Sequence, residues 1–217
     1  SRATYYRRKK PKLMLVMIDN RAPGDTRAPS PDAPAWAFDL PLYVLAAIQF
    51  ANHVMLGVMA SQLSVASWSA FAVTALNFAT VSVLCGTTAG YSGITLAHEL
   101  VHRRKWHEYT LGRILLMFVL YEHFSTEHVR GHHPRIGLPE DPATARFGET
   151  FKVFFRRTVP AQFKSAWHLE KVRLGDENMR WYDARMLGHR VLQGVVGEIG
   201  IVAATWALFG PISVIFF

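Results

Sequence analysis

Ten histidines lie in the chain, and five of them fall in two short motifs. The first motif is HELVH, in which His98 and His102 are four residues apart. The second is EHVRGHH, in which His128 and His132 repeat that spacing and His133 follows directly. Side chains four residues apart share one face of an α-helix, so each motif can direct two imidazoles at one metal ion. These five histidines are the predicted metal ligands.

The HELVH motif taken alone has the HExxH pattern of a zinc protease, with Glu99 as the general base that acts on water. A catalytic zinc normally takes three protein ligands, which would leave His128, His132 and His133 without a purpose. On a helix His133 points about 100° away from His132, which suits a second metal close by. Imidazole binds iron, copper, zinc and nickel, so ligand type does not name the metal, but ligand number favours two ions.

Carboxylates near the histidines form the second group of candidates. A metal-bound imidazole usually donates its outer N–H to a carboxylate or carbonyl, which fixes the ring. We expect this orienting role from Glu99, Glu127, Glu140 and Asp141, with Arg146 and Glu149 bracing the loop that follows. For the loop residues Glu140, Asp141, Arg146 and Glu149, a solvated polar turn explains the sequence equally well. Three other predictions concern the five remaining histidines: ring orientation or simple packing for His123, a hydrogen bond within a helix bundle for His53, and surface positions for His107, His168 and His189.

The elements that must position these residues are predicted to be membrane helices. Half of the residues are hydrophobic, and the stretch from Leu40 to Ala97 contains no Asp, Glu, Lys or Arg, whereas soluble domains are about one-quarter charged. Leu40–Ala60 is long enough to span a bilayer, and a second helix is predicted from Ala70 to His98 after a polar turn. At 1.5 Å per residue that second helix is about 42 Å long, so its HELVH end should protrude from a hydrocarbon core of about 30 Å. The sequence therefore predicts an all-α, polytopic membrane bundle.

Charge predicts the orientation of that bundle. Two crossings return the chain to the side of its basic N-terminal arm, and residues 103–105 are basic on that same side. Because Lys and Arg gather in cytoplasmic loops, the histidine cluster is predicted to face the cytoplasm from the inner membrane. This bias accounts for the net charge of +8, and no nucleic-acid-binding module is visible. Cys85 is the single cysteine, which excludes a CxxC zinc site, a disulfide framework and a rubredoxin-like iron site within this chain.

The chain divides into two predicted regions. Residues 1–39 are a basic, Pro-rich arm or inter-helix loop without the features of a signal peptide, and its short run LMLVMI cannot span a bilayer. Residues 40–217 form a single membrane-embedded domain. Three further segments of that domain have separate predictions: a half-buried or re-entrant helix at Ile114–Thr126, a helix at the membrane interface at Phe151–Arg173, and another spanning helix at Ile199–Phe217.

The motifs HELVHRR, YEHFSTEHVRGHH and PEDPATARFGE together resemble those of the membrane-bound alkane monooxygenases and xylene monooxygenases of the fatty acid desaturase–hydroxylase superfamily. The resemblance covers about Ala97 to Lys171, and the three motifs in combination are far more specific than HExxH. It implies a helical membrane oxygenase with two non-haem irons. By motif, the five histidines of HELVH and EHVRGHH match iron-ligand positions, and Phe124 and its neighbours are expected to line an apolar substrate channel.

The resemblance also implies an activity and partners. It implies O2-dependent hydroxylation of the terminal carbon of medium-chain alkanes or a related hydrocarbon drawn from membrane lipid. Electrons would come from a rubredoxin or ferredoxin-type partner with its reductase. A desaturase or an arene-methyl hydroxylase would use the same centre, and an intramembrane HExxH zinc protease is the alternative from another class.

The resemblance is incomplete toward the C-terminal side. The further histidines expected there, in motifs like NYxEHYG and HxxHH, are missing, because only His168 and His189 follow His133. We therefore expect an incomplete domain, and we expect this chain alone to be inactive. A non-enzymatic membrane scaffold is a further alternative.

Overall fold

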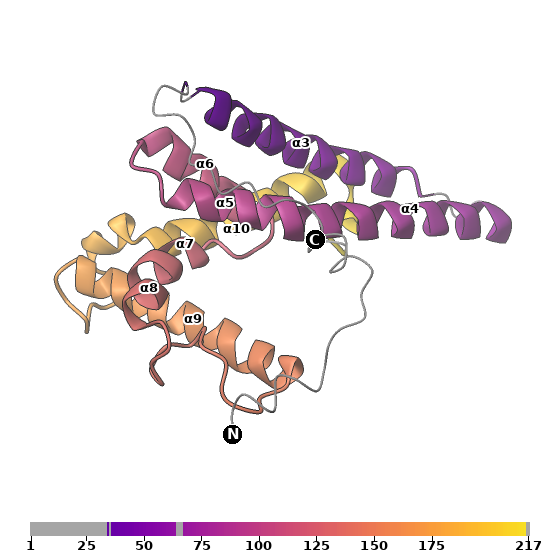
Figure 1. Ribbon diagram of the computed structural model, residues 1–217. Coiled ribbons are helices and arrows are strands. Elements are labelled where there is room, and N and C mark those ends of the chain that lie inside the picture. Colours follow the sequence, from indigo (N-terminus) through magenta and orange to yellow (C-terminus); the bar gives the residue numbers. More distant parts are fainter. Residues whose placement is uncertain (1–33, 35, 64–66, 216–217) are drawn as a thin grey trace. The chain divides into compact units, whose positions relative to one another are not determined.

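The computed structural model describes residues 34, 36–63 and 67–215, and this part of the chain consists of helices joined by loops (Figure 1). Three helices are long and apolar enough to cross a membrane: α3 (Trp36–Ser61), α4 (Trp68–Thr88) and α10 (Arg190–Phe209). No strand occurs among the described residues. The predicted all-α architecture with several membrane-spanning helices is confirmed.

The second predicted helix forms a continuous rod that ends at the first histidine motif. Ser67 caps the start of α4 by accepting a hydrogen bond from the backbone N–H of Ala70 at 3.2 Å, as a serine at this position commonly does. The rod continues through the π-helical turn η1 (Ala89–Gly93) into α5 (Ile94–Val101). The helix was predicted and the π-helical turn was not.

The α3 helix packs against the histidine end of this rod through a small apolar core. Ala46 on α3 lies in one buried cluster with residues of α5 and of α6 (Trp106–Met117). Farther along α3, Gln49 donates a hydrogen bond to Ser92 of η1 at 2.8 Å. The other members of the buried cluster are Leu96, Ala97, Leu100, Val101, Leu115 and Leu116.

The segment between α6 and the second histidine motif differs from the prediction. A single helix over Ile114–Thr126 is wrong, because α6 ends at Met117 and Leu120 takes a positive φ of 52°. A left-handed backbone cannot continue a right-handed helix. The chain resumes in α7 (Phe124–Thr126), the π-helical turn η2 (Glu127–His132) and the short α8 (His133–Arg135).

The C-terminal spanning helix also differs in its bounds. It begins at Arg190, before the predicted Ile199, and it ends at Phe209. Gly210 then takes a φ of 86°, a conformation in which glycine commonly terminates helices. Because Pro211 starts the separate short helix α11 (Pro211–Ile215), the predicted span to Phe217 is interrupted.

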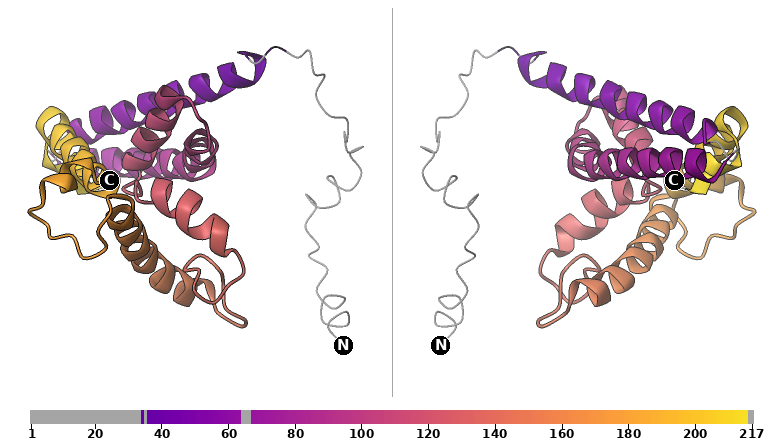
Figure 2. Two further views of the ribbon diagram at one scale, coloured as in Figure 1. Left: turned by 90° about the vertical axis from the view of Figure 1, so that its left-hand side faces the viewer. Right: turned by 90° about the vertical axis from the view of Figure 1, so that its right-hand side faces the viewer.

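The α9 helix (Phe151–Arg173) has the predicted bounds, while its position at a membrane interface stays a prediction. In two directions of view α5 and α7 lie between α3 and α9 (Figures 1 and 2). A 3-10 turn, η3 (Ala184–Gly188), lies in the connection between α9 and α10. Most of the predicted arm at residues 1–39, including LMLVMI, lies outside the described residues.

Candidate metal centre

The two histidine motifs meet in space at the end of the α4–η1–α5 rod. His98 lies on α5 and His102 directly follows it, whereas His128 lies on η2. One ring nitrogen from each of these three residues lies within 4.8 Å of the others. His133 joins them, since its Nε2 atom lies 3.0 Å from Nε2 of His128, which is itself 3.1 Å from Nε2 of His102. Residues that are 26 positions apart in sequence thus converge on one point.

The four clustered rings suit a metal ion. Nitrogens bound at about 2.0–2.1 Å to one ion, at ordinary ligand angles, are themselves about 3 Å apart, close to the separations seen here. Burial and the neighbouring histidines lower the pKa of His128 to about 3, and partial desolvation together with His98 and His133 lowers the pKa of His102. A ring that resists protonation keeps its lone pair for a metal. The donor set therefore fits a borderline divalent cation such as iron or zinc.

His132 lies at the edge of the cluster and is held by a carboxylate. Its ring centre is 5.7 Å from that of His128. Its Nδ1 atom is 2.8 Å from Oδ2 of Asp141, a fully buried side chain that also accepts hydrogen bonds from the Thr144 hydroxyl and the Ala143 backbone N–H. These hydrogen bonds lower the pKa of Asp141 although burial opposes them. Asp141 can thus fix the His132 ring with Nε2 free for a metal.

The other three predicted carboxylates lie elsewhere. Glu99 is exposed and accepts a hydrogen bond from Arg103 at 2.9 Å. Glu127 is fully buried and pairs with Arg135 at 2.8 Å. Glu140 is exposed. Within the described part of the chain, Asp141 is the member of the four that hydrogen-bonds to a histidine of the two motifs.

Buried ion pairs, which the sequence analysis missed, anchor the η2 turn to α9. Arg130 of η2 pairs with the fully buried Glu170 at 2.8 Å. Arg135 ties Glu127 to Ser165 of α9, donating to each at 2.8 Å. The signal was present in the motif EHVRGHHPR, where arginines alternate with the histidines. Glu127, the partner of Arg135, lies in the same motif, whereas Glu170, the partner of Arg130, is 40 residues away and no local pattern could identify it.

A glycine permits this packing within η2. A Cβ atom added at Gly131 would collide with the carboxylate of Glu127. Gly131 is buried and its carbonyl accepts a hydrogen bond from Arg135 at 2.7 Å. The GHH part of the second motif therefore has a steric role beside the histidines, since a larger residue would push the Glu127 carboxylate away from its arginine.

The loop after the second motif is braced largely by a residue of α9. The backbone N–H of Arg146 donates to Glu149 at 3.0 Å, which connects the predicted bracing pair. The main contact is from Arg157, which pairs with Glu149 at 2.8 Å and donates to the carbonyls of Pro142 and Thr144. Arg157 also holds the pKa of Glu149 at about 2.

The remaining histidines fall into three groups. His107 and His168 are exposed, as predicted. His53 forms the predicted hydrogen bond within the bundle, with Thr205 of α10 at 3.1 Å. A surface position for His189 is wrong: the ring is fully buried, caps α10 by accepting from Leu192 N–H, and lies 3.1 Å from the Trp167 carbonyl. The polar neighbours of His189 in sequence gave no sign of this capping role.

His123 is surrounded by aromatic rings, at 4.7 Å from Tyr121 and 5.3 Å from Phe163 between ring centres. Its Nε2 atom is buried and has no hydrogen-bond partner among the described residues. Burial lowers its pKa to about 4. Of the two roles considered for this residue, its surroundings favour packing.

A cavity of about 350 Å³ lies along the rod and extends toward its histidine end, although none of the five predicted metal ligands lines it. Its wall includes Ile94, one helical turn before His98, together with Leu115 and Phe118. Phe124 is not among its lining residues; it stacks instead on His128 with ring centres 4.7 Å apart. The volume is within the range of ligand pockets in proteins.

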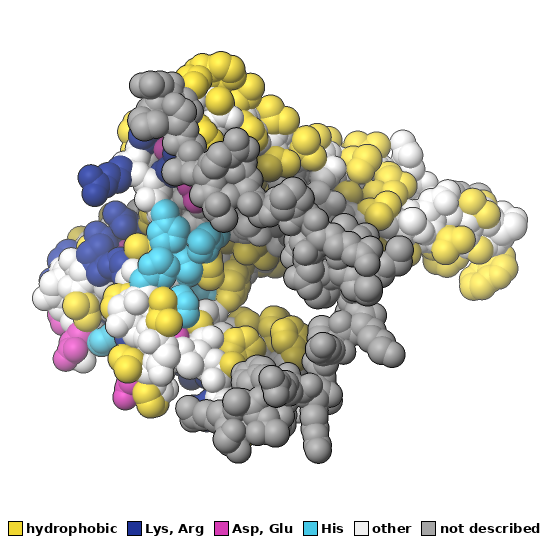
Figure 3. Space-filling view, viewed as in Figure 1, with side chains coloured by type: hydrophobic (Ala, Val, Ile, Leu, Met, Phe, Trp, Pro, Cys, Tyr) yellow, Lys and Arg dark blue, Asp and Glu magenta, His cyan; other side chains and the backbone are white. Residues whose placement is uncertain are grey.

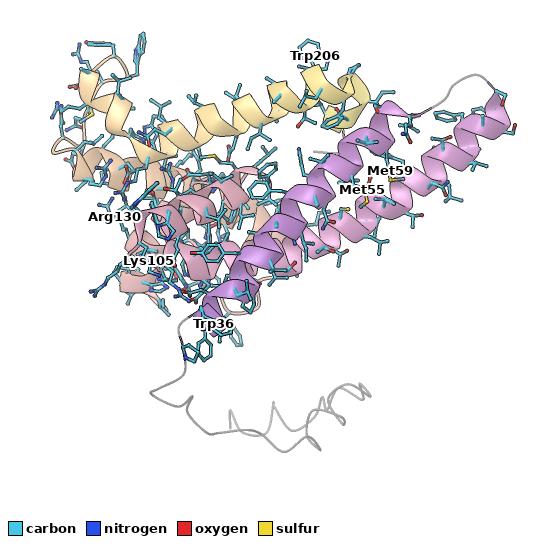
Figure 4. All side chains as sticks on the ribbon, turned by 90° about the horizontal axis from the view of Figure 1, so that it is seen from above. Trp36, Met55, Met59, Lys105, Arg130 and Trp206 are labelled. Atoms are coloured by element: carbon cyan, nitrogen blue, oxygen red, sulfur yellow. The ribbon has the colours of Figure 1, made fainter. Side chains whose placement is uncertain are left out.

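The surface beside the cluster is basic. The histidines form one continuous patch, with Lys and Arg side chains next to it (Figure 3). Lys105 and Arg130 lie at this end, whereas Met55 and Met59 lie on the far part of α3 (Figure 4). The candidate centre is therefore open to solvent at one side, and His102 is itself exposed.

The chain is similar in sequence to several proteins named alkane 1-monooxygenase. The chain is 34% identical over 140 residues to alkane 1-monooxygenase 1 of Alcanivorax borkumensis, covering 64% of this chain and 34% of that protein. It is 33% identical over 150 residues to alkane 1-monooxygenase of Ectopseudomonas oleovorans, covering 69% and 35%. With alkane 1-monooxygenase 1 of Pseudomonas aeruginosa the identity is 46% over 89 residues, covering 41% and 23%.

The matched regions span at most about a third of the length of these relatives. The sequence model of the fatty acid desaturase family matches residues 74–217 of the chain. That match contains both histidine motifs, the loop with Asp141, and α9 and α10. Because the family model matches most of this chain, and the chain has helices suited to crossing a membrane, the chain belongs to the fatty acid desaturase family.

Proposed function

We propose that the protein to which this chain belongs is an integral-membrane monooxygenase that hydroxylates the terminal carbon of medium-chain alkanes or a related hydrocarbon. One oxygen atom of O2 enters the C–H bond, and the other leaves as water with two protons and two electrons. The electrons come from a rubredoxin or ferredoxin-type protein with its reductase. The observation that carries the proposal is the convergence of HELVH and EHVRGHH beside a cavity within a membrane bundle.

Two non-haem irons are the proposed cofactor, and His98, His102, His128, His132 and His133 are the proposed ligands from this chain. When bound, the irons would supply the activation of O2 and the oxidation of the C–H bond. Iron suits the site because five imidazoles exceed the three protein ligands of a catalytic zinc. The match to the fatty acid desaturase family also supports iron as the metal.

The chain's own residues contribute position and protection. Asp141 holds the Nδ1 side of His132, so the ring offers Nε2 in a fixed orientation. The stacked Phe124 restricts His128. The ion pairs of Arg130 and Arg135 fix the turn that carries these histidines. The adjoining cavity would keep a hydrocarbon away from water next to the metal centre.

The geometry disfavours the zinc-protease alternative. A general base in HExxH must face the metal-bound water. Glu99 instead pairs with Arg103, which also contacts Asp39 at 3.1 Å. The protease hypothesis also assigns no role to the second histidine motif.

Metal analysis of the full-length protein purified from membranes tests the proposal. We expect two irons per protein, and we expect His132→Ala to lower the iron content markedly. His168→Ala is the matched control, because that histidine is exposed on α9. One zinc per protein, or unchanged iron in the His132 variant, would contradict the proposal.

Product analysis separates the related chemistries. With octane, the reconstituted protein should yield 1-octanol that carries one labelled atom from labelled O2. An alkene would identify a desaturase, and preferential oxidation of a xylene would identify an arene-methyl hydroxylase. Accessibility of a cysteine introduced by His107→Cys, at an exposed position five residues after His102, would test the proposed orientation toward the cytoplasm of the inner membrane.

A further inference from the structure

The cavity beside the candidate metal centre has an unusual lining for a site that takes a pure hydrocarbon. It lies among α3, the α4–η1–α5 rod, α6 and the C-terminal helices. Its described lining includes no Lys, Arg, Asp or Glu. Six polar side chains nevertheless line it: Gln49, Asn52, His53, Ser82, Thr205 and Ser213.

Most of these polar groups already have hydrogen bonds within the protein. Gln49 donates to Ser92 at 2.8 Å, and His53 lies 3.1 Å from the Thr205 hydroxyl. Ser82 donates to the carbonyl of Phe78 in its own helix at 2.8 Å. The Ser213 hydroxyl donates to the carbonyl of Gly210 at 2.6 Å. These groups need nothing from a ligand.

Asn52 is different. Among the described residues, its side-chain amide has no hydrogen-bond partner, although it can donate two hydrogen bonds and accept two. Asn52 lies within α3, one of the three candidate membrane spans. The Asn52 side chain is half-buried, and polar residues inside membrane helices usually have a functional role.

The position of Asn52 along the cavity can be placed relative to the histidines. Ala46 of α3 packs in one cluster with Ala97, the neighbour of His98. Asn52 is six residues farther along α3, which corresponds to about 9 Å along the helix axis. A group held by Asn52 would therefore lie several carbon atoms from the carbon next to the metal centre.

The opposite wall of the cavity leaves room for a chain along this path. It is formed by Cys85, Gly86, Ala89 and Gly90. A side chain added at Gly86 or Gly90 would meet no other atom within 4 Å. An elongated ligand can therefore lie along the rod between Asn52 and Ile94.

We propose that Asn52 recognises a small, uncharged polar group on a hydrocarbon substrate, such as a hydroxyl, ether or carbonyl oxygen, several carbons from the carbon that reacts. The absence of lysine and arginine from the described lining disfavours a carboxylate, because a buried unpaired charge is costly. The inference rests on the proposed function and deepens it. The preferred substrate is then an oxygenated chain, whose far end is hydroxylated with the same balance of O2, protons and electrons.

Binding measurements on the full-length protein in lipid nanodiscs test this independently of turnover. The probes are 1-octanol and nonane, which have the same number of heavy atoms, each competing with labelled nonane. Asn52→Leu should weaken 1-octanol relative to nonane roughly fivefold to tenfold, the value of one hydrogen bond. Asn77→Leu is the matched control, since it makes the same change at an exposed position of α4. It should leave the ratio unchanged.

A second series needs no variant. Dialkyl ethers of equal length that differ in the position of oxygen should show one optimum of affinity in the wild-type protein. A flat series, or an octanol-to-nonane ratio that Asn52→Leu leaves unchanged, would overturn the inference, and so would water as the sole partner of Asn52. If nonane is hydroxylated and the octanol-to-nonane ratio does not depend on Asn52, the inference fails and the proposed function stands. If neither probe is oxidised and no iron is found, the proposed function fails, while the binding ratios still decide the role of Asn52.

Discussion

The histidine end of the molecule and the far part of the membrane helices are built by opposite rules. At the histidine end, buried carboxylates pair with partly buried arginines: Glu122 with Arg113, Glu127 with Arg135, and Glu170 with Arg130. In the spans α3 and α4, only 11% of the most apolar window is buried within the protein. Large apolar side chains such as Leu76 and Leu84 point outward there, at 67% and 61% exposed.

This difference shows where the fold specifies position and where it specifies environment. Buried ion pairs contribute little net stability but demand one geometry, because an unpaired charge is costly. Outward apolar side chains gain their stability from lipid and demand no partner. The proposed metal ligands therefore lie where geometry is fixed, and the cavity with Asn52 lies between the two regions.

The largest effect is expected from breaking the most deeply buried ion pair. Arg113→Ala removes the partner of Glu122, which is 1% exposed, and also a hydrogen bond to the carbonyl of Arg190. We expect a destabilisation of about 3–5 kcal/mol, measured by denaturant unfolding in detergent. Arg104→Ala, at an exposed position of the same basic end, is the control and should change little. Equal effects of the two variants would mean that the pairs do not organise this end.

The pH response of this variant sharpens the test. Burial raises the pKa of the Glu122 carboxyl above its ordinary value of 4.5, although Arg113 opposes the shift. A raised folded-state pKa means that the charged carboxylate destabilises the fold at higher pH, and that the penalty fades as pH falls through that pKa. The cost of Arg113→Ala should therefore be smaller at mildly acidic than at mildly alkaline pH.

A slightly smaller effect is expected from His123 as pH falls. Its pKa is lowered from 6.5 to about 4 by burial. The unfolded state binds a proton at His123 below about pH 6.5, whereas the folded state binds it only below about pH 4. The fold therefore loses stability progressively as pH falls from 6.5 to about 4, by up to about 3 kcal/mol. His123→Phe keeps an aromatic ring and removes the titration. Its stability should depend less on pH across that window than that of the wild type, and an unchanged slope would refute the assignment.

The sequence predicted the division between the apolar spans and the histidine site. It did not predict where individual helices end or which side chains connect the segments. Hydropathy located α3 and α4 because a span needs only a run of apolar residues, and the spacing of His98 and His102 predicted that they share a face. In the second motif the π-helical turn η2 brings His133 beside His128 and leaves the predicted partner His132 at the edge of the cluster. The break at Leu120 and the end of α10 at Gly210 depend on single backbone conformations, which tertiary packing selects. The contact of His189 with the Trp167 carbonyl, the pairing of Arg130 with Glu170 and the hydrogen bond from Arg135 to Ser165 depend on contacts between distant segments. The unpaired amide of Asn52 became visible only with the cavity around it.

The smallest effect is expected from the outward apolar face, and it is the most direct test of the contrast. Leu84→Ala should change the free energy of unfolding in detergent by less than about 0.5 kcal/mol, because its side chain is 61% exposed and has little protein packing to lose. Leu116→Ala makes the same change in the core beneath the histidines, where the side chain is fully buried, and should cost about 2–5 kcal/mol. A large cost at Leu84 would mean that protein covers this face in the membrane. In that case α4 would be part of an interface, and the far half of the bundle would be specified by contacts in the same way as the histidine end.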